Sequence, residues 1–277
     1  MSAAAVPPLP VHHVRRRALD IATLGTQPPD PERCRVRVAP PCAVKEGDDL
    51  RIVALNLLET GVNLTRLAAA VQHLPFQRFG RVSGVPREAV TFGYAPRSPL
   101  AQDYCTAARL RVTDPGAEAA LCRAAQVVAR FYRAYHPALY AWHYAWVRTN
   151  VLPMYRLPGS PFTSGVVNRS TLPFHHDGGN LPGGWSGMLV FRYNVSGGEL
   201  VIPELDLAVA LPDHSLLLFD GAALVHGVVP VTPTGADSFR RSVVYYSRRA
   251  MWECAPPDRE LERIRRLGTE RSRRSSP

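Results

Sequence analysis

Beyond about residue 150, the chain consists of short apolar runs separated by turn residues. Gly, Pro, Asn and Asp fill the gaps between these runs. The runs span residues 187–195, 199–203, 207–212, 215–219, 224–231 and 242–247. Many short strands at regular spacing indicate antiparallel sheets that close into a sandwich or barrel. The sequence therefore predicts a β-sheet core over about residues 150–250.

The upstream half of the chain contains helical patterns. Residues 50–58 are an apolar run of strand length, and a helix is expected over residues 64–74. The clearest helix spans about residues 116–135, where apolar side chains recur at helical spacing behind Asp114, a good N-cap. Residues 140–147 fit either an aromatic strand or a second helical segment. We therefore expect an α+β protein with N-terminal helices packed against the β core.

Composition divides the chain into three parts. Residues 1–45 are rich in Pro and Arg, and we expect them to form an extended arm. Residues 46–254 are expected to form a single domain, since their length and apolar content suffice for one large core. Residues 255–277 are a basic polar tail, expected to be a frayed helix or disordered.

The chain is strongly basic, with a formal net charge of +10. Of its 33 basic residues, all but Lys45 are Arg. The planar, permanently charged guanidinium suits phosphates and stacks on bases. This balance indicates a polyanionic partner, with nucleic acid first. A GC-rich genome, which favours Arg codons, explains the Arg excess equally well.

The cysteines and the absence of targeting signals suggest a compartment. The five cysteines are scattered and lack Cys-x-x-Cys spacing, so neither a disulfide framework nor a zinc ribbon is expected. A reducing intracellular compartment fits this pattern, nuclear in a eukaryote and cytoplasmic otherwise. No secretory signal and no uninterrupted apolar stretch of about 20 residues is visible, so we expect no membrane span.

A candidate metal site lies in the segment FHHDGGN, residues 174–180. In an extended segment His175 and Asp177 point to the same side, and His176 points away. His226, in the apolar run 224–231, is the candidate third ligand. Two imidazoles and one carboxylate leave three positions open on an octahedral metal, as in non-haem Fe(II) oxygenases. Zinc is the competing metal, although it more often takes cysteines or closer histidines and keeps one open position.

A candidate anion site follows in the segment FRRSVVYYS, residues 239–247. On a strand, Arg240, Ser242 and Tyr246 share one face, and Arg241 lies on the other. A dicarboxylate that chelates iron needs a cation for its distal carboxylate, and Arg with a nearby hydroxyl supplies charge-assisted hydrogen bonds. Arg240 with Ser242 fits this role, and Arg241 is the adjacent alternative.

Together these segments resemble the 2-oxoglutarate- and Fe(II)-dependent dioxygenases, whose fold is a double-stranded β-helix, or jelly roll. More narrowly they resemble the TET/JBP family, which oxidises the methyl group of 5-methylcytosine or thymine in DNA. The resemblance rests on FHHDGGN at 174–180, GGELVIPELDLAVALPDHSLLLFDG at 197–221, HGVVPV at 226–231 and Arg240-x-Ser242. The chain lacks the cysteine-rich zinc region of the animal members and looks like the compact protist, fungal, algal or phage forms.

The resemblance implies the cofactors and the residues that bind them. Fe(II) would be held by His175, Asp177 and His226, and 2-oxoglutarate by Arg240 and Ser242. Molecular oxygen would be the second co-substrate. The resemblance therefore implies an enzyme, a 2-oxoglutarate- and Fe(II)-dependent dioxygenase, and we expect it to act as a monomer.

The resemblance also implies a substrate, a methylated base flipped out of DNA. By the family pattern Asn180 would hydrogen-bond the flipped base, and Tyr246 would stack on it. Arg248 stands where the animal cytosine-oxidising members carry a base-reading histidine. We expect oxidation of 5-methylcytosine to 5-hydroxymethylcytosine or further, with thymine in DNA as the alternative.

Three rival interpretations share part of this pattern. A dioxygenase acting on protein or a small molecule, such as a prolyl hydroxylase, would need the metal ligands and the arginine but neither Asn180 nor Tyr246. A cupin-like binding module without turnover would show a lost metal ligand, and none is missing. A different co-substrate is disfavoured by Arg240-x-Ser242.

Overall fold

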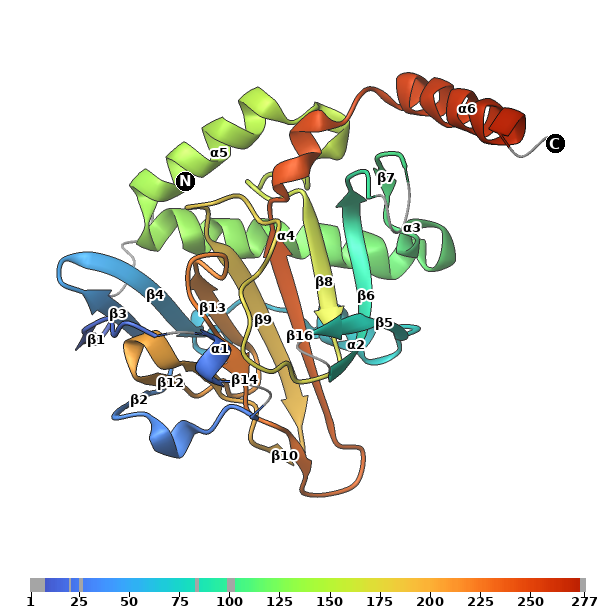
Figure 1. The fold of residues 1–277 in the computed structure, drawn as a ribbon. Helices are drawn as coiled ribbons and strands as arrows, with labels where there is room; N and C mark the ends of the chain where they lie inside the picture. Colours follow the sequence, from blue (N-terminus) through green and yellow to red (C-terminus); the bar gives the residue numbers. More distant parts are fainter. Residues whose placement is uncertain (1–7, 20, 25–26, 83–84, 99–102, 275–277) are drawn as a thin grey trace.

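The computed structural model describes residues 8–19, 21–24, 27–82, 85–98 and 103–274. Two β-sheets face each other, and helices cover the outer face of the larger sheet (Figure 1). This arrangement is the jelly roll with added helices that the sequence predicts.

The larger sheet forms the centre of the molecule. Its strands are β1 (Val11–Val14), β3 (Cys42–Glu46), β4 (Asp49–Asn56), β5 (Gln77–Val82), β6 (Val85–Ala95), β7 (Thr106–Ala107), β8 (Ser164–Asn168), β9 (Ser186–Tyr193), β13 (Ser215–Phe219) and β16 (Phe239–Tyr246). Their order is β1-β3-β4-β13-β9-β16-β8-β6-β5, and β7 pairs with β6. The strands on either side of β16 are antiparallel to it, so its side chains alternate between the two faces of the sheet.

The smaller sheet covers the other face of the larger one. Its strands are β2 (Val36–Val38), β11 (Leu200–Ile202), β12 (Leu207–Val209) and β14 (Gly227–Val228), in the order β14-β11-β12-β2. A separate short ribbon pairs β10 (Val195–Ser196) with β15 (Thr232–Pro233). The apolar run 224–231 is thus strand only at β14, and the rest of it is loop.

The helices fall mainly between the N-terminal strands and the β core. They are α1 (Ile21–Leu24), α2 (Thr65–Gln72), α3 (Leu110–Thr113), α4 (Pro115–Tyr135), α5 (Pro137–Asn150) and α6 (Pro257–Arg274). Short 3-10 turns are η1 (Pro31–Arg33), η2 (Leu57–Thr60), η3 (Pro153–Tyr155), η4 (Pro203–Leu205) and η5 (Arg249–Glu253). No helix in these described segments is long and apolar enough to cross a bilayer.

The helix α4 begins and ends where the sequence predicts. Its N-cap Asp114 accepts a hydrogen bond from the backbone N–H of Ala117 at 2.9 Å, which satisfies one of the free donors of the first turn. The segment 140–147, for which strand and helix were both open, lies inside α5. A helix is compatible with Pro137, which occupies the first helical position of α5.

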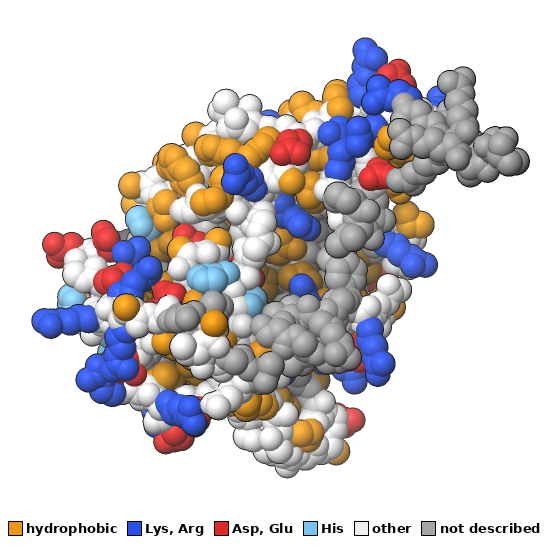
Figure 2. Space-filling view, viewed as in Figure 1, with side chains coloured by type: hydrophobic (Ala, Val, Ile, Leu, Met, Phe, Trp, Pro, Cys, Tyr) orange, Lys and Arg blue, Asp and Glu red, His pale blue; other side chains and the backbone are white. Residues whose placement is uncertain are grey.

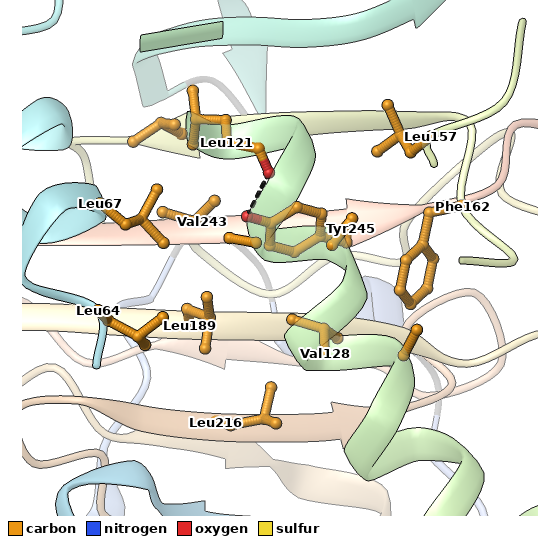
Figure 3. Close-up of a cluster of buried hydrophobic side chains, with 14 of the residues drawn as sticks. Leu64, Leu67, Leu121, Val128, Leu157, Phe162, Leu189, Leu216, Val243 and Tyr245 are labelled. Atoms are coloured by element: carbon orange, nitrogen blue, oxygen red, sulfur yellow. Dashed lines mark hydrogen bonds between the residues drawn. The ribbon is translucent and has the colours of Figure 1, made fainter. Parts of the chain in front are cut away.

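The main core lies between α4 and the outer face of the larger sheet (Figure 3). Side chains of α2 and α4 pack there on Leu189, Leu216 and Val243. The hydroxyl of Tyr245 is buried in this core and donates to the carbonyl of Leu121 at 3.0 Å. The odd-numbered residues of β16 therefore face the helices, and its even-numbered residues face the smaller sheet.

A second core fills the space between the two sheets. It contains Val190, Leu200, Ile202, Leu207 and Leu217, each at most 1% exposed. Branched aliphatic side chains from both sheets interdigitate here, as in other β-sandwiches. The rigid wall that they form supports the cavity described below.

The structure corrects the expectation of an extended N-terminal arm over residues 1–45. Where this segment is described, β1 pairs with β3 in the larger sheet, and β2 pairs with β12 in the smaller one. Val14, Val38 and Val44 are buried in the core between the sheets. The segment packs on the domain because these apolar side chains alternate with the Arg and Pro residues that dominate its composition. Residues 1–7 lie outside the described segments.

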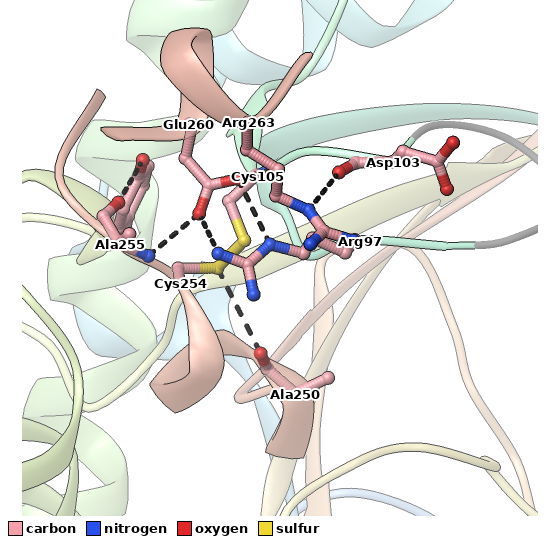
Figure 4. A network of polar contacts seen from close by, with 9 residues as sticks. Arg97, Asp103, Cys105, Ala250, Cys254, Ala255, Glu260 and Arg263 are labelled. Carbon is pink, nitrogen blue, oxygen red and sulfur yellow. Dashed lines mark hydrogen bonds and ion pairs between the residues drawn. A yellow bond between two sulfur atoms is a disulfide. The ribbon is translucent and has the colours of Figure 1, made fainter. Parts of the chain in front are cut away.

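The C-terminal helix α6 is anchored by a buried carboxylate (Figure 4). Glu260 is 2% exposed, pairs with Arg97, and accepts hydrogen bonds from the backbone N–H groups of Cys105 and Ala255 at 3.1 and 2.8 Å. Arg263 adds a hydrogen bond to the carbonyl of Asp103 at 3.1 Å. The expected polar tail is therefore a helix that docks at its first turns.

The cysteine expectation was wrong for one pair. Cys105 and Cys254 form a disulfide beside Glu260, across a sequence separation of 149 residues (Figure 4). Partners so far apart leave no spacing pattern in the sequence, which is why it did not predict them. The disulfide also removes the cysteine argument for a reducing compartment. Cys34, Cys42 and Cys122 are free thiols.

Candidate active site

Two histidines far apart in the sequence, His175 and His226, lie side by side in the fold. The backbone N–H of His175 donates to the carbonyl of His226 at 2.9 Å, and the N–H of His226 donates to the carbonyl of His175 at 3.0 Å. This reciprocal pair fixes the two backbones side by side. The imidazole rings lie 4.4 Å apart between centroids.

Asp177 reaches the same point from the loop that follows His175. Its backbone N–H donates to the carbonyl of Gly221 at 2.9 Å. A Cβ atom at Gly221 would lie 2.4 Å from Oδ2 of Asp177, so a side chain at this position would displace the carboxylate. Gly221 is therefore part of the site, because only glycine leaves room for the carboxylate.

The side chains of His175, Asp177 and His226 converge. One ligand atom from each lies within 4.8 Å of the others. Nε2 of His175 is 3.7 Å, and Nε2 of His226 3.9 Å, from Oδ1 of Asp177. Nδ1 of each histidine lies 2.8 to 2.9 Å from a backbone carbonyl, that of Pro173 or Leu224. A carbonyl only accepts, so each Nδ1 carries the proton and each Nε2 offers a lone pair toward the carboxylate.

The titration of Asp177 and His226 fits metal binding. Burial raises the pKa of Asp177, but the neighbouring His175 and His226 outweigh it and the net pKa lies below its usual value. Burial lowers the pKa of His226 to about 4. At neutral pH the site therefore offers an ionised carboxylate and a neutral imidazole, the forms that bind a divalent cation.

This donor set suits iron better than zinc. Two imidazole nitrogens and one carboxylate oxygen, with no thiolate, can occupy one face of an octahedral ion and leave three positions for a chelating co-substrate and oxygen. A structural zinc site would be closed by a fourth protein ligand. Within the described residues, these three form the one group of ligand-type side chains that could hold a metal.

A buried guanidinium lies further along the inner face of β16. Arg240 is 5% exposed, and its Nη2 donates to the carbonyl of Gly198 at 3.2 Å. Its Nε is buried without a hydrogen-bond partner. Burial lowers the pKa of Arg240 to about 10, and the nearby Arg192 adds to the effect, yet the group stays charged at neutral pH. A buried cation with a free donor suits the distal carboxylate of 2-oxoglutarate.

The alternative residue, Arg241, points to the other face of the sheet. Its guanidinium lies 4.9 Å from the ring centroid of Phe76 and 5.9 Å from that of Phe239, so it stacks on aromatic rings. Ser242, on the face of Arg240, lines the cavity beside the metal ligands. The strand alternation thus separates the two arginines as the sequence predicts.

A cavity of about 290 Å³ opens between the sheets next to the three metal-ligand candidates. Its inner wall comes from aliphatic residues of both sheets, and its polar residues gather at the metal and at the mouth. The predicted site residues that line it are His175, Asp177, Asn180, His226, Ser242, Tyr246 and Arg248. Arg240 is not among the lining residues and lies behind Ser242 on the same face of the strand.

Three of these residues form the mouth of the cavity. Asn180 and Arg248 face each other as an isolated β-bridge, and the side-chain amide of Asn180 donates to the hydroxyl of Ser186 at 3.3 Å. Tyr246 lines the same cavity. Burial raises the pKa of Tyr246, so its hydroxyl is protonated at neutral pH. An amide, an aromatic ring and a guanidinium are thus available to a planar polar group.

The structure adds cavity residues that sequence reasoning missed. Arg87 lines the cavity from β6, and its Nε donates to Oδ1 of Asn168 on the neighbouring strand β8 at 3.0 Å. Both lie outside the motifs around the metal ligands. No spacing signal in the sequence connects them to the site, since sheet pairing alone brings them there.

The site and fold define a class of protein, a jelly-roll oxygenase with a two-histidine, one-carboxylate metal centre. The family model described as the oxygenase domain of the 2OGFeDO superfamily, TET/JBP type, matches residues 97–249, more than half of the chain. The chain belongs to this family. It is a 2-oxoglutarate- and Fe(II)-dependent dioxygenase, as the sequence predicts.

Two solved structures resemble this chain at low sequence identity, and the first of them shares its fold. A structure of NgTET1 in complex with 5mC DNA is 13% identical and has a TM-score of 0.55, covering 83% of this chain and 90% of that one. An oxidoreductase of the 2OG-Fe(II) oxygenase family from Burkholderia pseudomallei is 16% identical with a TM-score of 0.48, covering 72% and 86%. No curated protein matches the chain in sequence.

Proposed function

We propose that this dioxygenase oxidises the methyl group of a modified base in DNA, with 5-methylcytosine as the first candidate. The observation that carries the proposal is the mouth of the cavity. Asn180, Tyr246 and Arg248 line the same cavity as His175 and Asp177. A dioxygenase that acted on an aliphatic side chain would not need an amide, an aromatic ring and a guanidinium at this place.

In this proposal, His175, Asp177 and His226 hold the iron, and Arg240 with Ser242 holds the distal carboxylate of 2-oxoglutarate. When bound, iron and 2-oxoglutarate supply the oxidising chemistry, which converts 2-oxoglutarate and oxygen to succinate and CO₂ and hydroxylates a C–H bond. The aliphatic residues of the inner wall exclude water from this space. The protein's task is to place the methyl group beside the metal.

The flipped base would use the mouth of the cavity. A methyl group inside a duplex is out of reach, so the base must leave the stack at a cost of a few kcal/mol. Stacking on Tyr246 offsets part of this cost, and hydrogen bonds from Asn180 and Arg248 to the polar edge offset more. The net charge of +10 supports binding to the phosphate backbone. The NgTET1 structure, which is a complex with 5mC DNA, supports the same substrate class.

Thymine in DNA is the second candidate, and Arg248 is the observation that favours it. A guanidinium only donates hydrogen bonds. At ring position 4, thymine presents an accepting carbonyl and cytosine presents a donating amine. Arg248 lines the cavity and has room to meet that edge. Asn180 can satisfy either base, because its amide both donates and accepts.

Mass spectrometry of nucleosides tests the proposal. The purified protein is incubated with iron, 2-oxoglutarate and duplex DNA that contains 5-methylcytosine, and the nucleosides are then analysed. The expected product is 5-hydroxymethylcytosine, or a more oxidised form, and 5-hydroxymethyluracil if thymine is the substrate. His226→Ala is the matched control and should give neither.

Other outcomes separate the rival interpretations. Succinate formation that is stimulated by peptides or small metabolites, with no modified nucleoside, would replace the DNA proposal by the first rival. Iron binding without any formation of succinate would favour the cupin-like binding module that lacks turnover. The metal ligands and the 2-oxoglutarate site are tested separately, by the variants His226→Ala and Arg240→Gln.

A further inference from the structure

A buried histidine lies behind the mouth of the cavity and takes no part in the function proposed above. His143 is on the inner side of α5 and is 1% exposed. The rings of Tyr132, Trp142 and Phe162 surround it, with centroids 5.9 to 6.2 Å from its own. Burying a polar group is unfavourable unless it is hydrogen-bonded. The partner of His143 therefore indicates what the residue does.

That partner is Ser247, the residue between Tyr246 and Arg248. Nε2 of His143 lies 2.8 Å from Oγ of Ser247, and Oγ of Ser247 lies 2.5 Å from the carbonyl of Pro161. A hydroxyl has one proton and a carbonyl only accepts, so Ser247 donates to Pro161. Ser247 therefore accepts from His143, whose proton is on Nε2. Burial lowers the pKa of His143 to about 3, which keeps the ring neutral in this tautomer.

The backbone around Ser247 holds the loop that carries Asn180. The carbonyl of Ser247 accepts from the N–H of Leu181 at 2.7 Å, and the N–H of Arg249 donates to the carbonyl of Gly179 at 2.9 Å. Asn180 lies between these two bonds. A displacement of Ser247 would therefore move Tyr246 and Asn180 relative to each other.

His143 also contacts the far end of the same loop. A Cβ atom at Gly184 would lie 3.0 to 3.2 Å from three atoms of the imidazole, so the glycine backbone packs directly on the ring. The neighbouring Trp142 approaches Gly183 in the same way, at 3.7 Å from the corresponding Cβ position. Figure 2 shows apolar side chains gathered over α5, with histidine side chains nearer the middle of the same face. The helix thus supports the loop from its inner side.

We propose that His143 is a positioning residue that, through Ser247 and Gly184, sets the placement of Asn180, Tyr246 and Arg248 for the substrate base. The proposal rests on the proposed function, because it assigns these three residues to base recognition. It predicts that the residue controls how well 2-oxoglutarate consumption is coupled to base oxidation. It does not assign His143 to iron or to 2-oxoglutarate.

The test compares His143→Phe with a matched control. Phenylalanine keeps a planar aromatic ring, slightly larger than imidazole, and removes the hydrogen bond. The control is Tyr245→Phe. It removes a buried hydroxyl from β16, the strand that also carries Tyr246, but on the face toward α4. The measured quantity is the ratio of oxidised base to 2-oxoglutarate consumed, together with KM for methylated DNA. Misplacement by about 1 Å can lower a rate roughly 100-fold, so the ratio should fall at least about tenfold in His143→Phe and stay near the wild-type value in Tyr245→Phe.

Ser247→Ala gives a second route to the same result, since it removes the acceptor and leaves His143 in place. If His143→Phe does not fold, Ser247→Ala alone decides the question. In the double variant the two decreases in the ratio should not add, because both substitutions remove the same hydrogen bond between His143 and Ser247. Additive losses, an unchanged ratio in either single variant, or an equal fall in Tyr245→Phe would overturn the proposal.

A substrate-free measurement separates this proposal from the function on which it rests. Hydrogen exchange of the Leu181 amide should be faster in His143→Phe and unchanged in Tyr245→Phe. If the wild-type protein oxidises no base, the proposed function fails, whatever the exchange shows. If the wild-type protein oxidises a base and neither the ratio nor the exchange responds to His143→Phe, only the positioning role fails.

Discussion

The two ends of the cavity are held in different ways. At the metal end, backbone hydrogen bonds between His175, His226, Asp177 and Gly221 fix the ligands directly. At the mouth, the loop with Asn180 lies against the end of β16, and the side chain of His143 supports both from behind. Main-chain hydrogen bonds therefore fix both ends, but only at the mouth does a buried side chain from another element, His143, support them. Changes at the two ends should have separable effects on cofactor binding and on substrate coupling.

The largest effect is expected at the metal end, from His226→Ala. Loss of a residue that merely orients a ligand typically costs 10- to 100-fold in metal affinity, so removing a ligand should weaken iron binding by at least about 100-fold and abolish 2-oxoglutarate turnover. Iron content and succinate formation measure the change. His176→Ala is the control, since this neighbouring imidazole is outside the three-ligand group and should retain iron. Full iron retention in His226→Ala would show that His226 is not an iron ligand.

The next effect concerns 2-oxoglutarate and separates the two arginines of β16. A hydrogen bond to a charged group contributes roughly 1.5–3 kcal/mol, so Arg240→Gln should raise KM for 2-oxoglutarate roughly 10- to 100-fold. Arg241→Gln, on the opposite face over Phe76, should leave that KM near its wild-type value. Kinetics of succinate release measure both. A raised KM for 2-oxoglutarate in Arg241→Gln, with an unchanged KM in Arg240→Gln, would show that Arg241 binds the distal carboxylate.

A smaller effect is expected at the mouth, from Asn180→Ala. A single neutral hydrogen bond contributes about 1 kcal/mol, so oxidation of methylated DNA should fall roughly fivefold or more. Uncoupled decay of 2-oxoglutarate should continue, because the side chain of Asn180 is bonded to Ser186 and not to a metal ligand. Its contact with Asp177 is a backbone hydrogen bond at 3.4 Å, which alanine keeps. The two rates are measured in one reaction, by nucleoside analysis and by succinate. Parallel loss of both rates would place Asn180 in the cofactor site.

The remaining effect is on stability and not on catalysis, and it follows from the pKa of His143, which burial lowers from 6.5 to about 3. Between these values the unfolded chain binds a proton that the folded protein does not, so the free energy of unfolding falls as the pH is lowered. The slope contributed by one such group reaches about 1.4 kcal/mol per pH unit.

Urea unfolding of the metal-free protein at pH values from about 7 to 5 measures this slope. His143→Phe should have a shallower dependence on pH than the wild type. Tyr245→Phe should be less stable by a similar amount at each pH, with the slope unchanged. An equal slope in the wild type and His143→Phe would mean that the imidazole is protonated in the fold.

The sequence predicts those parts of the molecule that have a local signal. Helix α4 follows from Asp114 and a 3.6-residue apolar period, and the two faces of β16 follow from simple alternation. The His-x-Asp pair is visible because both ligands lie on one short extended segment. His226 is predicted as the third ligand from its place in a later apolar run, beyond several predicted strands, and the resemblance then supports it.

Long-range contacts without a local pattern could not be predicted. Cys105 and Cys254 meet because the end of β16 returns to the loop after β6, and no spacing rule covers that distance. Arg87 enters the cavity through the pairing of β6 with β8. His143 lies in an aromatic helix whose inner face is not evident from periodicity. The N-terminal strands were missed because Pro and Arg dominate the composition around their few apolar residues.

The central claim is that the space between the iron ligands and the Asn180–Tyr246–Arg248 mouth holds a methylated base. The most direct test is the stoichiometry of oxidised nucleoside to succinate, with duplex DNA containing 5-methylcytosine or unmodified DNA as substrate. About one oxidation step per succinate is expected for the wild-type protein with a base that it oxidises, so the ratio is near one when the product is the hydroxymethyl base. For Asn180→Ala the ratio should be several-fold lower. Abundant succinate with no oxidised nucleoside from either DNA would contradict the central claim.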